Sequence, residues 1–578
     1  MVLFASRDAG TRSLRRARLR LRVLMAVFVL AFFSVGLRLV DLTTGARATK
    51  PQVLSLRRGD GAPDIGRADI LDRRGVTLAT NLRVNSVIAD PSRVNFPERA
   101  AHRLADALGL NEAALLARLK RGGRFAWIKR RISPREEALV KDLGLPGVAL
   151  QPDEERVYPQ KNLVSHVLGF TGDDNQGLAG IELAEQDRLV GGEAKGKGPL
   201  VLSIDVAVQN VVREATMKAF LRFHAKGACA IVFDTRTRAF LSLVSLPDFD
   251  PNRATREPST NRQNRCSGHT YELGSLFKIF TTAFALDAGA ASLFDRLDAS
   301  QPLYIGRHPI HDDHAKFRWL TVPEAFAFSS NIGMVRLIQK VDDPERQKGF
   351  LRRLGLFGTS KVELPDTRPP LLPRRWPFIT QATVAYGHGI AVSPVNYVEA
   401  VASLIDDGRF RPGTVLRRGL EDVPPGEPVV AAKTVRDMRW LLWLTTDRGT
   451  GDQARLDRYL TGGKTGTADK AVYGRGYVKG AVVASFVSVL PVDDPRYLVL
   501  VTLDEPQGDA ATHGFRYGGW TAAPVAAEII ERVGPLLGLE PSPPEARARM
   551  EARLQVYPAM NGHSHETEEG LAAVRLDP

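Results

Sequence analysis

The sequence predicts an α/β protein in which a helix-flanked sheet follows one membrane-spanning helix and an elongated α+β pedestal. Strand-like segments occur near both ends of residues 199–540 with helical patterns between them, which indicates a sheet assembled from distant segments. Short β-like runs and turns fill residues 59–198. The expected parts are a cytoplasmic N-terminus (1–22), an anchor (23–42), a pedestal that contacts partners (43–198), the α/β domain (199–540) and a flexible tail (541–578).

An apolar run from Val23 to Leu37 follows seven arginines. This run is shorter than the roughly 20 residues of a typical spanning helix, but flanking arginines can reach the two interfaces. The arginines predict a cytoplasmic N-terminus, an inner-membrane anchor and a periplasmic α/β domain. The alternative is a cleaved signal peptide with its site at "ARA", residues 46–48. We favour the anchor, because that site lies well beyond the apolar run and contains an arginine.

The composition allows several classes of protein. The chain has 578 residues, of which 44% are hydrophobic and 25% charged, and this suffices for two or more domains. A net charge of +14 favours an anionic partner or surface, but no nucleic-acid-binding signature is present, so nucleic acid is not an expected partner. Cys229 and Cys266 are too few for a disulfide framework. One bridge between them stays possible, and Cys229 alone reads as a small core residue in a strand.

The α/β domain is expected to begin with a strand and an amphipathic helix in "LVLSIDVAVQNVVREATMKAF", residues 200–220. Two strands around a tight turn follow in residues 227–247. Helices dominate to about residue 450, and strands return in "AVVASFVSVLP" and "RYLVLVTLDEP", residues 481–491 and 496–506. A helix over about 522–537 closes the domain.

A serine and a lysine lie three residues apart in "YELGSLFK", residues 271–278. On a helix this spacing places Ser275 and Lys278 on one face, and Gly274 lets the backbone turn closely before them. A lysine serves as the base for a serine nucleophile only if its pKa falls well below about 10.4, which burial or a neighbouring cation achieves. This motif alone is weak, because it occurs often by chance.

Two further motifs strengthen the prediction of a serine nucleophile. "AFAFSSNIGM" supplies hydroxyls and an amide, and "LTGGKTGTADK" supplies a second cation with two hydroxyls suited to a carboxylate. The glycine of the second motif is expected to leave room for a ligand along a strand edge. Together with S-x-x-K these motifs occur in the order found in penicillin-recognising serine enzymes. The residues concerned are Ser329, Ser330, Asn331, Lys464, Thr465, Gly466 and Thr467.

These residues predict acyl transfer through a covalent ester. Ser275 attacks a carbonyl and a neutral Lys278 accepts its proton. Ser329 relays a proton to the leaving amine, while Asn331 orients Lys278 and the substrate. The backbone N–H groups of Ser275 and Thr467 are the expected oxyanion donors.

With these motifs, the chain resembles the class B penicillin-binding proteins, and within them the septal peptidoglycan D,D-transpeptidase (FtsI) family. The resemblance extends from the anchor to about residue 540. It includes "DRRGVTLA", "HVLGFTGDDNQGLAGIE", "SLPDFDPN", "YGHGIAVSP" and "GGWTAAP". It implies cross-linking of stem peptides at D-Ala-D-Ala, acylation by β-lactams, and a cell-division setting with an FtsW-type membrane glycosyltransferase and other division proteins as partners.

The resemblance also implies substrate contacts by Tyr386 and His388 of "YGHG", near the cleft entrance, and by Ser330. Leu273 stands where many relatives have proline, and His388 where many have tyrosine. "TRTRAF" lacks the glycine usual in its turn. These departures affect substrate and drug preference rather than activity.

Other functions are less well supported. A D,D-carboxypeptidase or β-lactamase would use the same motifs and needs a group that positions water, for which Glu363 is one candidate. A noncatalytic division scaffold should lack a catalytic group, and none is missing. "RHPIHDDHAKF" groups histidines and aspartates (His308, His311, Asp312, Asp313, His314), but a polar loop explains them better than a metal site. No metal or cofactor is expected.

Overall fold

The computed structural model describes residues 66–191, 198–472 and 476–557, together with five residues between Met25 and Ser34. The chain divides into two compact units, Met1–Asp64 and Ile65–Pro578, and the second is described here. Within the described parts of the chain, no helix is both long and apolar enough to cross a membrane. The predicted anchor and the basic N-terminus lie almost wholly outside those parts.

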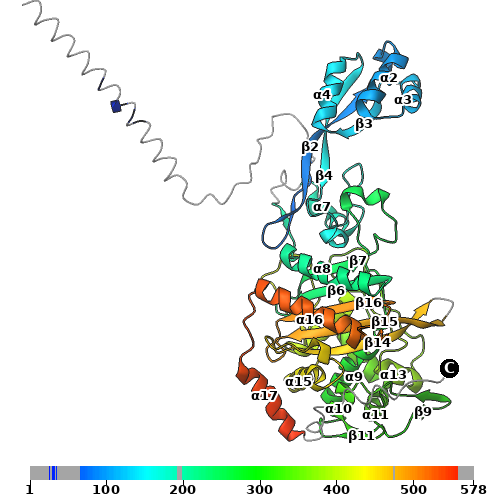
Figure 1. The fold of residues 1–578 in the computed structure, drawn as a ribbon, viewed down its shortest axis with the longest axis vertical. Helices are drawn as coiled ribbons and strands as arrows, with labels where there is room; N and C mark the ends of the chain where they lie inside the picture. Colours follow the sequence, from blue (N-terminus) through cyan, green and yellow to red (C-terminus); the bar gives the residue numbers. More distant parts are fainter. Residues whose placement is uncertain are drawn as a thin grey trace, which may run out of the picture. The chain divides into compact units, whose positions relative to one another are not determined.

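The pedestal is built on a long antiparallel strand pair. Strand β2 (Thr77–Ala89) pairs with β4 (Val148–Val157) over ten residues, from Thr80 opposite Val157 to Ala89 opposite Val148. The sheet order is β3-β2-β1-β5, with β4 also on β2, and the remaining strands are β1 (Ile70–Leu71), β3 (Ala126–Ile132) and β5 (Leu200–Val201). Helices α2, α3 and α4 gather at one end of this strand pair, where they share an apolar core with β2 and β3 (Figure 1).

The helices of this end have clear start and stop signals. Helix α2 (Pro97–Leu108) begins with proline and ends at a left-handed Gly109. Asn111 caps α3 (Glu112–Lys120), and Ser133 forms a capping box with Glu136 at the start of α4 (Pro134–Leu143). Local sequence therefore determines these boundaries.

The other end of the pedestal is irregular and contains a buried ionic cluster. Residues 180–189 form two short helices that meet at Glu185, α6 (Gly180–Ala184) and α7 (Gln186–Leu189), and α5 (Ser165–Leu168) packs on α6. The carboxylate of Glu182 is fully buried and accepts hydrogen bonds from Arg67 Nε and, at 2.7 Å, from Arg156 Nε. Both buried cations thus share one anion.

The predicted sheet of distant segments is confirmed in the second domain. Its order is β14-β15-β16-β6-β7, with antiparallel pairing throughout. The central strands β6 and β16 are buried along their whole length. The strand bounds are β6 (Gly227–Asp234), β7 (Ala239–Leu246), β14 (Gly462–Val472), β15 (Gly476–Leu490) and β16 (Tyr497–Asp504).

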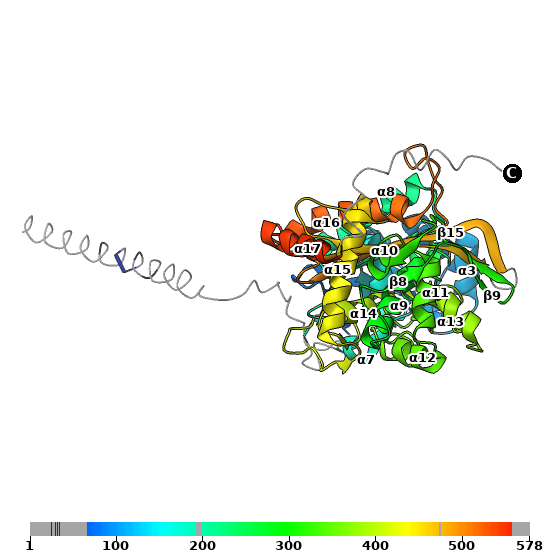
Figure 2. The same ribbon diagram turned by 90° about the horizontal axis from the view of Figure 1, so that it is seen from below.

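Helices cover both faces of this sheet. Helices α8 (Val206–Arg222) and α16 (Gly518–Leu536) pack on one face (Figure 1). On the other face α9 (Lys278–Asp287) lies among further helices, as Figure 2 shows from below. These are α10 (Val322–Ala327), α11 (Asn331–Gln339), α12 (Pro344–Arg353), α13 (Phe378–Ala385), α14 (Pro394–Ile405) and α15 (Ala432–Arg448). Six short strands form three small antiparallel pairs: β8 with β11, β9 with β10, and β12 with β13. Their bounds are β8 (Arg296–Asp298), β9 (Leu303–Ile305), β10 (His308–Ile310), β11 (Trp319–Thr321), β12 (Arg409–Phe410) and β13 (Glu427–Pro428).

The prediction of a flexible tail over 541–578 is wrong for its first part. Residues Pro544–Val556 form helix α17, which buries Ala546, Met550 and Leu554 and accepts a hydrogen bond from Trp440 Nε1 at Met550 O, 3.1 Å away. One small or apolar residue at every fourth position is a stripe too narrow to stand out in the sequence. Residues 558–578 lie outside the described part of the chain.

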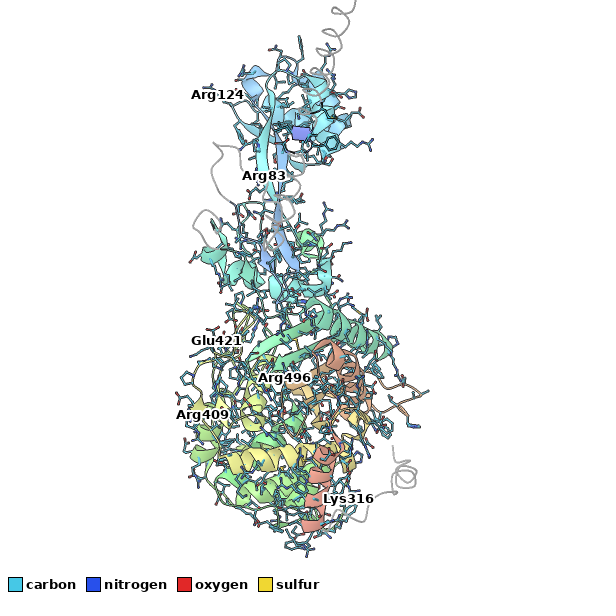
Figure 3. All side chains as sticks on the ribbon, turned by 90° about the vertical axis from the view of Figure 1, so that its left-hand side faces the viewer. Arg83, Arg124, Lys316, Arg409, Glu421 and Arg496 are labelled. Carbon is cyan, nitrogen blue, oxygen red and sulfur yellow. A yellow bond between two sulfur atoms is a disulfide. The ribbon has the colours of Figure 1, made fainter. Side chains whose placement is uncertain are left out.

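The positive charge of the chain is spread over both domains. Exposed cations labelled in Figure 3 include Arg83 and Arg124 on the pedestal and Lys316 and Arg409 on the second domain. In contrast to these exposed cations, Lys278 and Lys464 of the S-x-x-K and K-T-G motifs are buried.

Candidate active site

Ser275 lies in a short 3₁₀ turn, Gly274–Phe277, directly before α9. Gly274 has a φ of +52°, and a Cβ there would collide with the carbonyl oxygen of Thr467 on β14. Only glycine allows this left-handed turn so close to the strand. The turn therefore places Ser275 beside β14 and leaves Lys278 as the first residue of α9, with its side chain fully buried.

Two buried lysines converge on Ser329, in the bend between α10 and α11. Lys278 Nζ donates hydrogen bonds to the carbonyl oxygen of Ser329 and, at 3.1 Å, to its Oγ. Lys464 Nζ lies 2.9 Å from the same Oγ and 3.2 Å from Thr465 O. The structure thus brings one residue of each motif together, and Ser329 adopts a φ of +61° to present both oxygens.

Burial lowers the pKa of both lysines. For Lys278 the pKa falls to about 8, although Asp312 and Asp313 oppose the shift. For Lys464, burial and the charge of Lys278 hold the pKa well below its usual value. Two buried ammonium groups that share one hydroxyl titrate as a pair, so one of them loses its proton more easily than a free lysine does. This arrangement supplies a lysine that can act as a base.

The Ser275 hydroxyl itself makes no hydrogen bond to another residue that the structure describes. The Lys278 ammonium is directed to Ser329 rather than to Ser275. Catalytic hydrogen bonds often form only when substrate is bound, so this geometry is compatible with Lys278 as the base of Ser275.

Strand β14 is the edge of its sheet. The residues of the K-T-G motif on this strand differ in their surroundings. Thr465 is buried, and its hydroxyl lies 2.7 Å from that of Thr450. Thr467 Oγ1 accepts a hydrogen bond from Gly518 N at 3.0 Å, so its own proton stays available for a ligand. The expectation that Gly466 leaves room for a ligand needs correction: a Cβ at Gly466 would meet Leu273 O and the Leu276 side chain. The glycine accommodates the nucleophile turn.

Ser330 and Asn331 hold a loop in place. Ser330 is buried, accepts a hydrogen bond from Gly333 N at 2.8 Å as the N-cap of α11, and donates to Asp312 Oδ2 at 2.6 Å. Its hydroxyl therefore has a structural role, and the substrate contact that the sequence predicts for Ser330 stays a prediction. Asn331 Nδ2 donates to His311 O at 2.9 Å, and no hydrogen bond joins Asn331 to Lys278 among the described residues.

The histidine-rich loop thus braces the start of α11. No group of three or more potential metal ligands is found in the described parts of the chain. Sequence reasoning missed the role of Asp312 as a partner of Ser330, the N-cap of α11, and of Ile332 in its first turn. The aspartate appeared there only as one member of a polar run.

Tyr386 and His388 follow α13 and lie beside the nucleophile turn. Their rings are 5.3 Å apart, and a Cβ at the intervening Gly387 would collide with the Gly274 carbonyl. His388 Nδ1 lies 3.5 Å from Glu272 Oε2, and the Tyr477 hydroxyl donates to the same carboxylate at 3.0 Å. Glu272 and Tyr477 were not singled out from the sequence, since no motif marks Tyr477 and the strand pairing alone brings it here.

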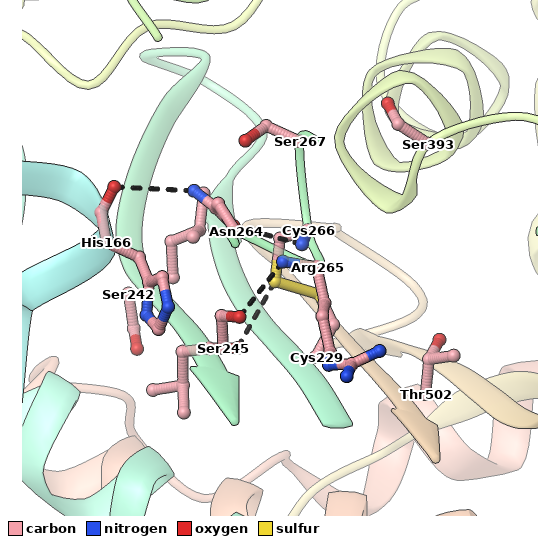
Figure 4. The surroundings of a disulfide bond; sticks show 12 residues. His166, Cys229, Ser242, Ser245, Asn264, Arg265, Cys266, Ser267, Ser393 and Thr502 are labelled. Carbon is pink, nitrogen blue, oxygen red and sulfur yellow. Dashed lines mark hydrogen bonds between the residues drawn. A yellow bond between two sulfur atoms is a disulfide. The ribbon is translucent and has the colours of Figure 1, made fainter. Parts of the chain in front are cut away.

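A disulfide joins β6 to the segment that leads to the nucleophile turn. Cys229 on β6 is bonded to Cys266, with Cα atoms 5.4 Å apart across 37 residues of sequence (Figure 4). Cys229 is thus half of a bridge and not merely a small core residue. Neighbouring hydrogen bonds hold the same segment: Arg265 N donates to Ser245 Oγ at 2.9 Å, and Asn264 Nδ2 to His166 O at 3.5 Å. The segment that leads to Ser275 is therefore attached to both the sheet and the pedestal.

A serine on a tight turn, a buried lysine one turn later and a second lysine on an adjacent strand define a serine-nucleophile site for acyl transfer. Comparison with known proteins agrees. Residues 228–531 match the penicillin-binding protein transpeptidase domain, and residues 64–197 match the penicillin-binding protein dimerisation domain. The chain belongs to this family of penicillin-binding proteins.

Relatives match along most of the chain. The chain is 35% identical over 539 residues to the probable peptidoglycan D,D-transpeptidase FtsI of Caulobacter vibrioides, covering 90% of this chain and 89% of that protein. It is 33% identical to the probable peptidoglycan D,D-transpeptidase PenA of Neisseria gonorrhoeae, covering 83% and 86% respectively. A peptidoglycan synthetase structure from Bifidobacterium adolescentis, 21% identical, shares the fold with a TM-score of 0.65 over 83% of this chain and 97% of that chain.

Proposed function

We propose that this protein is a peptidoglycan D,D-transpeptidase that cross-links stem peptides through an ester on Ser275. The observation that carries the proposal is the convergence of two buried lysines on Ser329, next to the nucleophile turn. Two buried cations that share no carboxylate are costly, and such cost is typical of a catalytic site. The names of the relatives and the match to a transpeptidase domain support the same activity.

The first half of the reaction forms the ester. Neutral Lys278 removes the proton of Ser275, whose Oγ attacks the carbonyl of the penultimate D-Ala. The N–H groups of Ser275 and Thr467 hold the oxyanion, which the close approach of Gly274 to Thr467 supports. The peptide bond then breaks, and the proton passes through Ser329 Oγ to the leaving D-Ala amine.

The terminal carboxylate of the donor fits the Lys464 side of the site. Lys464 supplies positive charge, and the Thr467 hydroxyl has a free proton to donate because it already accepts from Gly518 N. In the second half of the reaction an acceptor amine attacks the ester. Lys278 accepts the amine proton and passes it to Ser275 Oγ as the ester bond breaks, so Ser275 is released as the hydroxyl and a new amide links two strands.

The candidate for positioning water in a hydrolase is engaged elsewhere in the described structure. Glu363, the candidate from the sequence, accepts hydrogen bonds from Thr414 Oγ1 at 2.8 Å and from Val415 N at 2.9 Å. Its carboxylate is thus occupied in holding the backbone between β12 and β13. This favours aminolysis over hydrolysis of the ester.

The setting that we propose is septal wall synthesis at the inner membrane. The arginine-rich N-terminus and the apolar run after it support a single anchor with the catalytic domain in the periplasm. The disulfide fits an oxidising compartment. An FtsW-type glycosyltransferase and other division proteins are the partners that the pedestal would contact.

Labelling with a fluorescent penicillin tests the proposal. We expect long-lived label on Ser275 in the full-length protein and none in Ser275→Ala, which should keep the fold because Ser275 is only half buried. Label that turns over rapidly would indicate a hydrolase. Absence of label on folded protein, with the membrane partner added, would contradict an active transpeptidase.

A further inference from the structure

The pedestal ends, far from the second domain, in a tip formed by residues 91–99 and 119–125. Just after β4, Tyr158 N donates to Asn252 Oδ1 of the second domain at 2.9 Å. Strand β4 starts beside Ala89, the last residue of β2, and its ten residues place the two ends about 30 Å apart. The tip is therefore remote from the active site, and the proposed reaction gives it no role.

The two segments of the tip lie side by side. Lys120 Nζ lies 2.6 Å from Glu98 Oε1, so the last turn of α3 contacts the first turn of α2. Ala126, the first residue of β3, pairs with Ala89, so the chain that precedes β3 also reaches this end of the pedestal. Side chains of both segments therefore share one surface.

Two phenylalanine rings are exposed on the tip. Phe96 is 68% exposed and Phe125 is 54% exposed, although Phe125 also packs edge-to-face on Trp127 with ring centroids 5.2 Å apart. The turn before Phe125 contains Gly122 and Gly123 at φ values of +76° and +95°, and a Cβ at either position would meet nothing within 4 Å. This turn therefore borders open space rather than packing on the pedestal.

Four arginines of the tip lack an anionic partner. All four are exposed, and none forms an ion pair with a residue that the structure describes. They are Arg93, Arg99, Arg121 and Arg124, the last of which is labelled at this end of the pedestal in Figure 3. Their charge is available to an anionic surface.

The carboxylates near the tip do not cancel this charge. Glu98 is already paired with Lys120, and Asp90 accepts hydrogen bonds from Ser92 N and Oγ at 3.1 and 2.6 Å. Asp142, at the end of α4, is exposed. With Lys120 included, the cations outnumber these carboxylates, so the tip carries a net positive charge.

Exposed cations beside exposed aromatic rings suit the surface of an anionic bilayer. Basic side chains close to such a surface are attracted to its lipid phosphates, and aromatic rings favour the depth of the headgroups. A purely ionic ligand would leave the two phenylalanine rings in water. The combination therefore favours a phospholipid surface over an acidic peptide that offers charge alone.

The membrane of the proposed anchor is within reach of the tip. The described chain starts at Gly66, beside the Arg67–Glu182 pair at the other end of the pedestal. Residues 43–65 separate this point from the proposed anchor and can span at most about 80 Å. That limit exceeds the length of the β2–β4 pair, so the covalent link allows the tip to touch the bilayer.

We propose that the tip docks on the anionic phospholipid surface of the membrane that holds the anchor. The inference rests on the proposed anchor, adds a second contact with the same membrane, and is independent of the transpeptidase chemistry. The arginines contact lipid phosphates and the two phenylalanine rings lie among the headgroups. The pedestal is then held at both of its ends.

Energy transfer in proteoliposomes tests the docking. Asn95 is exposed in the tip, and Asn95→Cys in the full-length protein accepts a single donor dye because Cys229 and Cys266 are bonded to each other. The acceptor dye is carried by lipid headgroups. Transfer should be stronger in vesicles of phosphatidylcholine with phosphatidylglycerol than in phosphatidylcholine alone, and it should fall as salt is added.

Paired substitutions locate the effect. In the double variant Arg121→Gln/Arg124→Gln, the ratio of docked to undocked protein on the anionic vesicles should fall about 30-fold, as for the loss of two basic contacts. The matched control is Arg83→Gln/Arg135→Gln, which removes the same charge from two exposed positions of the pedestal outside the tip (Arg83 is labelled in Figure 3). This control should keep the transfer of the parent protein.

Equal transfer in the two kinds of vesicle, or unchanged transfer in the tip variant, would overturn the proposal. Transfer that needs an added division protein instead of anionic lipid would also overturn it and indicate a protein partner. Protein that carbonate washes from both kinds of vesicle would contradict the anchor, whereas retained protein whose transfer ignores lipid charge contradicts only the docking. Penicillin labelling of the same vesicles reports separately on the active site.

Discussion

Buried charges occur in two places in this molecule, and they are arranged in opposite ways. In the pedestal, Arg67 and Arg156 share the carboxylate of Glu182, so each cation has an anionic partner. In the active site, Lys278 and Lys464 share only the neutral hydroxyl of Ser329. Paired charges hold a structure together, whereas unpaired like charges shift pKa values. The difference separates a structural cluster from a catalytic one.

Removing a lysine from the active site should slow the chemistry strongly without loss of the fold. In Lys278→Met we expect penicillin acylation to slow by about 10²–10⁴-fold, because general-base help is worth that much. Stability should be kept or increased, since a buried amine without an anionic partner disappears. Stopped-flow labelling and denaturant unfolding measure the two effects. Rapid acylation of the variant would show that another group is the base.

Removing the shared anion of the pedestal should instead destabilise the fold and leave the chemistry of the active site unchanged. Glu182→Gln leaves two buried guanidinium groups without a counter-charge, at a cost of about 3–5 kcal/mol in the free energy of unfolding of the pedestal. Hydrogen exchange at the amides of β2 and β4 would detect that loss. Penicillin labelling of the remaining folded protein should persist, and Glu421→Gln serves as the neutral control. An unchanged exchange pattern would mean that the cluster contributes little.

The titration of Lys278 provides the finest test of the comparison. Its pKa of about 8 predicts that acylation rises by up to tenfold per pH unit below about pH 8 and levels off above it. The free lysine titrates at 10.5, so between these values the unfolded chain binds more protons, and stability should rise with pH. Acylation rates from about pH 6 to about pH 10, with unfolding of wild type and Lys278→Met, measure both trends. A flat rate profile would exclude the lysine as base.

Much of the fold was predictable from the sequence, since its strands are long apolar runs and its motifs have fixed spacing. The sheet of distant segments and the cluster of Lys278, Ser329 and Lys464 follow from such patterns. Roles that depend on what fills the neighbouring space did not follow. Gly466 accommodates the nucleophile turn because Leu273 and Leu276 occupy the space beside it. The Ser330 hydroxyl donates to Asp312, which belongs to another loop.

Features formed by single long-range contacts also could not be predicted from the sequence. Tyr477 reaches Glu272 across 205 residues, and α17 packs on α15 through a stripe of only one residue per turn. The pairing of Cys229 with Cys266 was left open, because spacing alone does not place two sulfurs together.

That disulfide gives the maturation of the protein a fixed order. A cytosol keeps thiols reduced, so on the proposed topology the bridge closes only after residues 229–266 have crossed the membrane. The segment that leads to the nucleophile is then linked to β6 in the same compartment as the peptides that the protein is proposed to join. Protein produced in a reducing cytosol would therefore lack the disulfide that the exported protein forms after it has crossed the membrane.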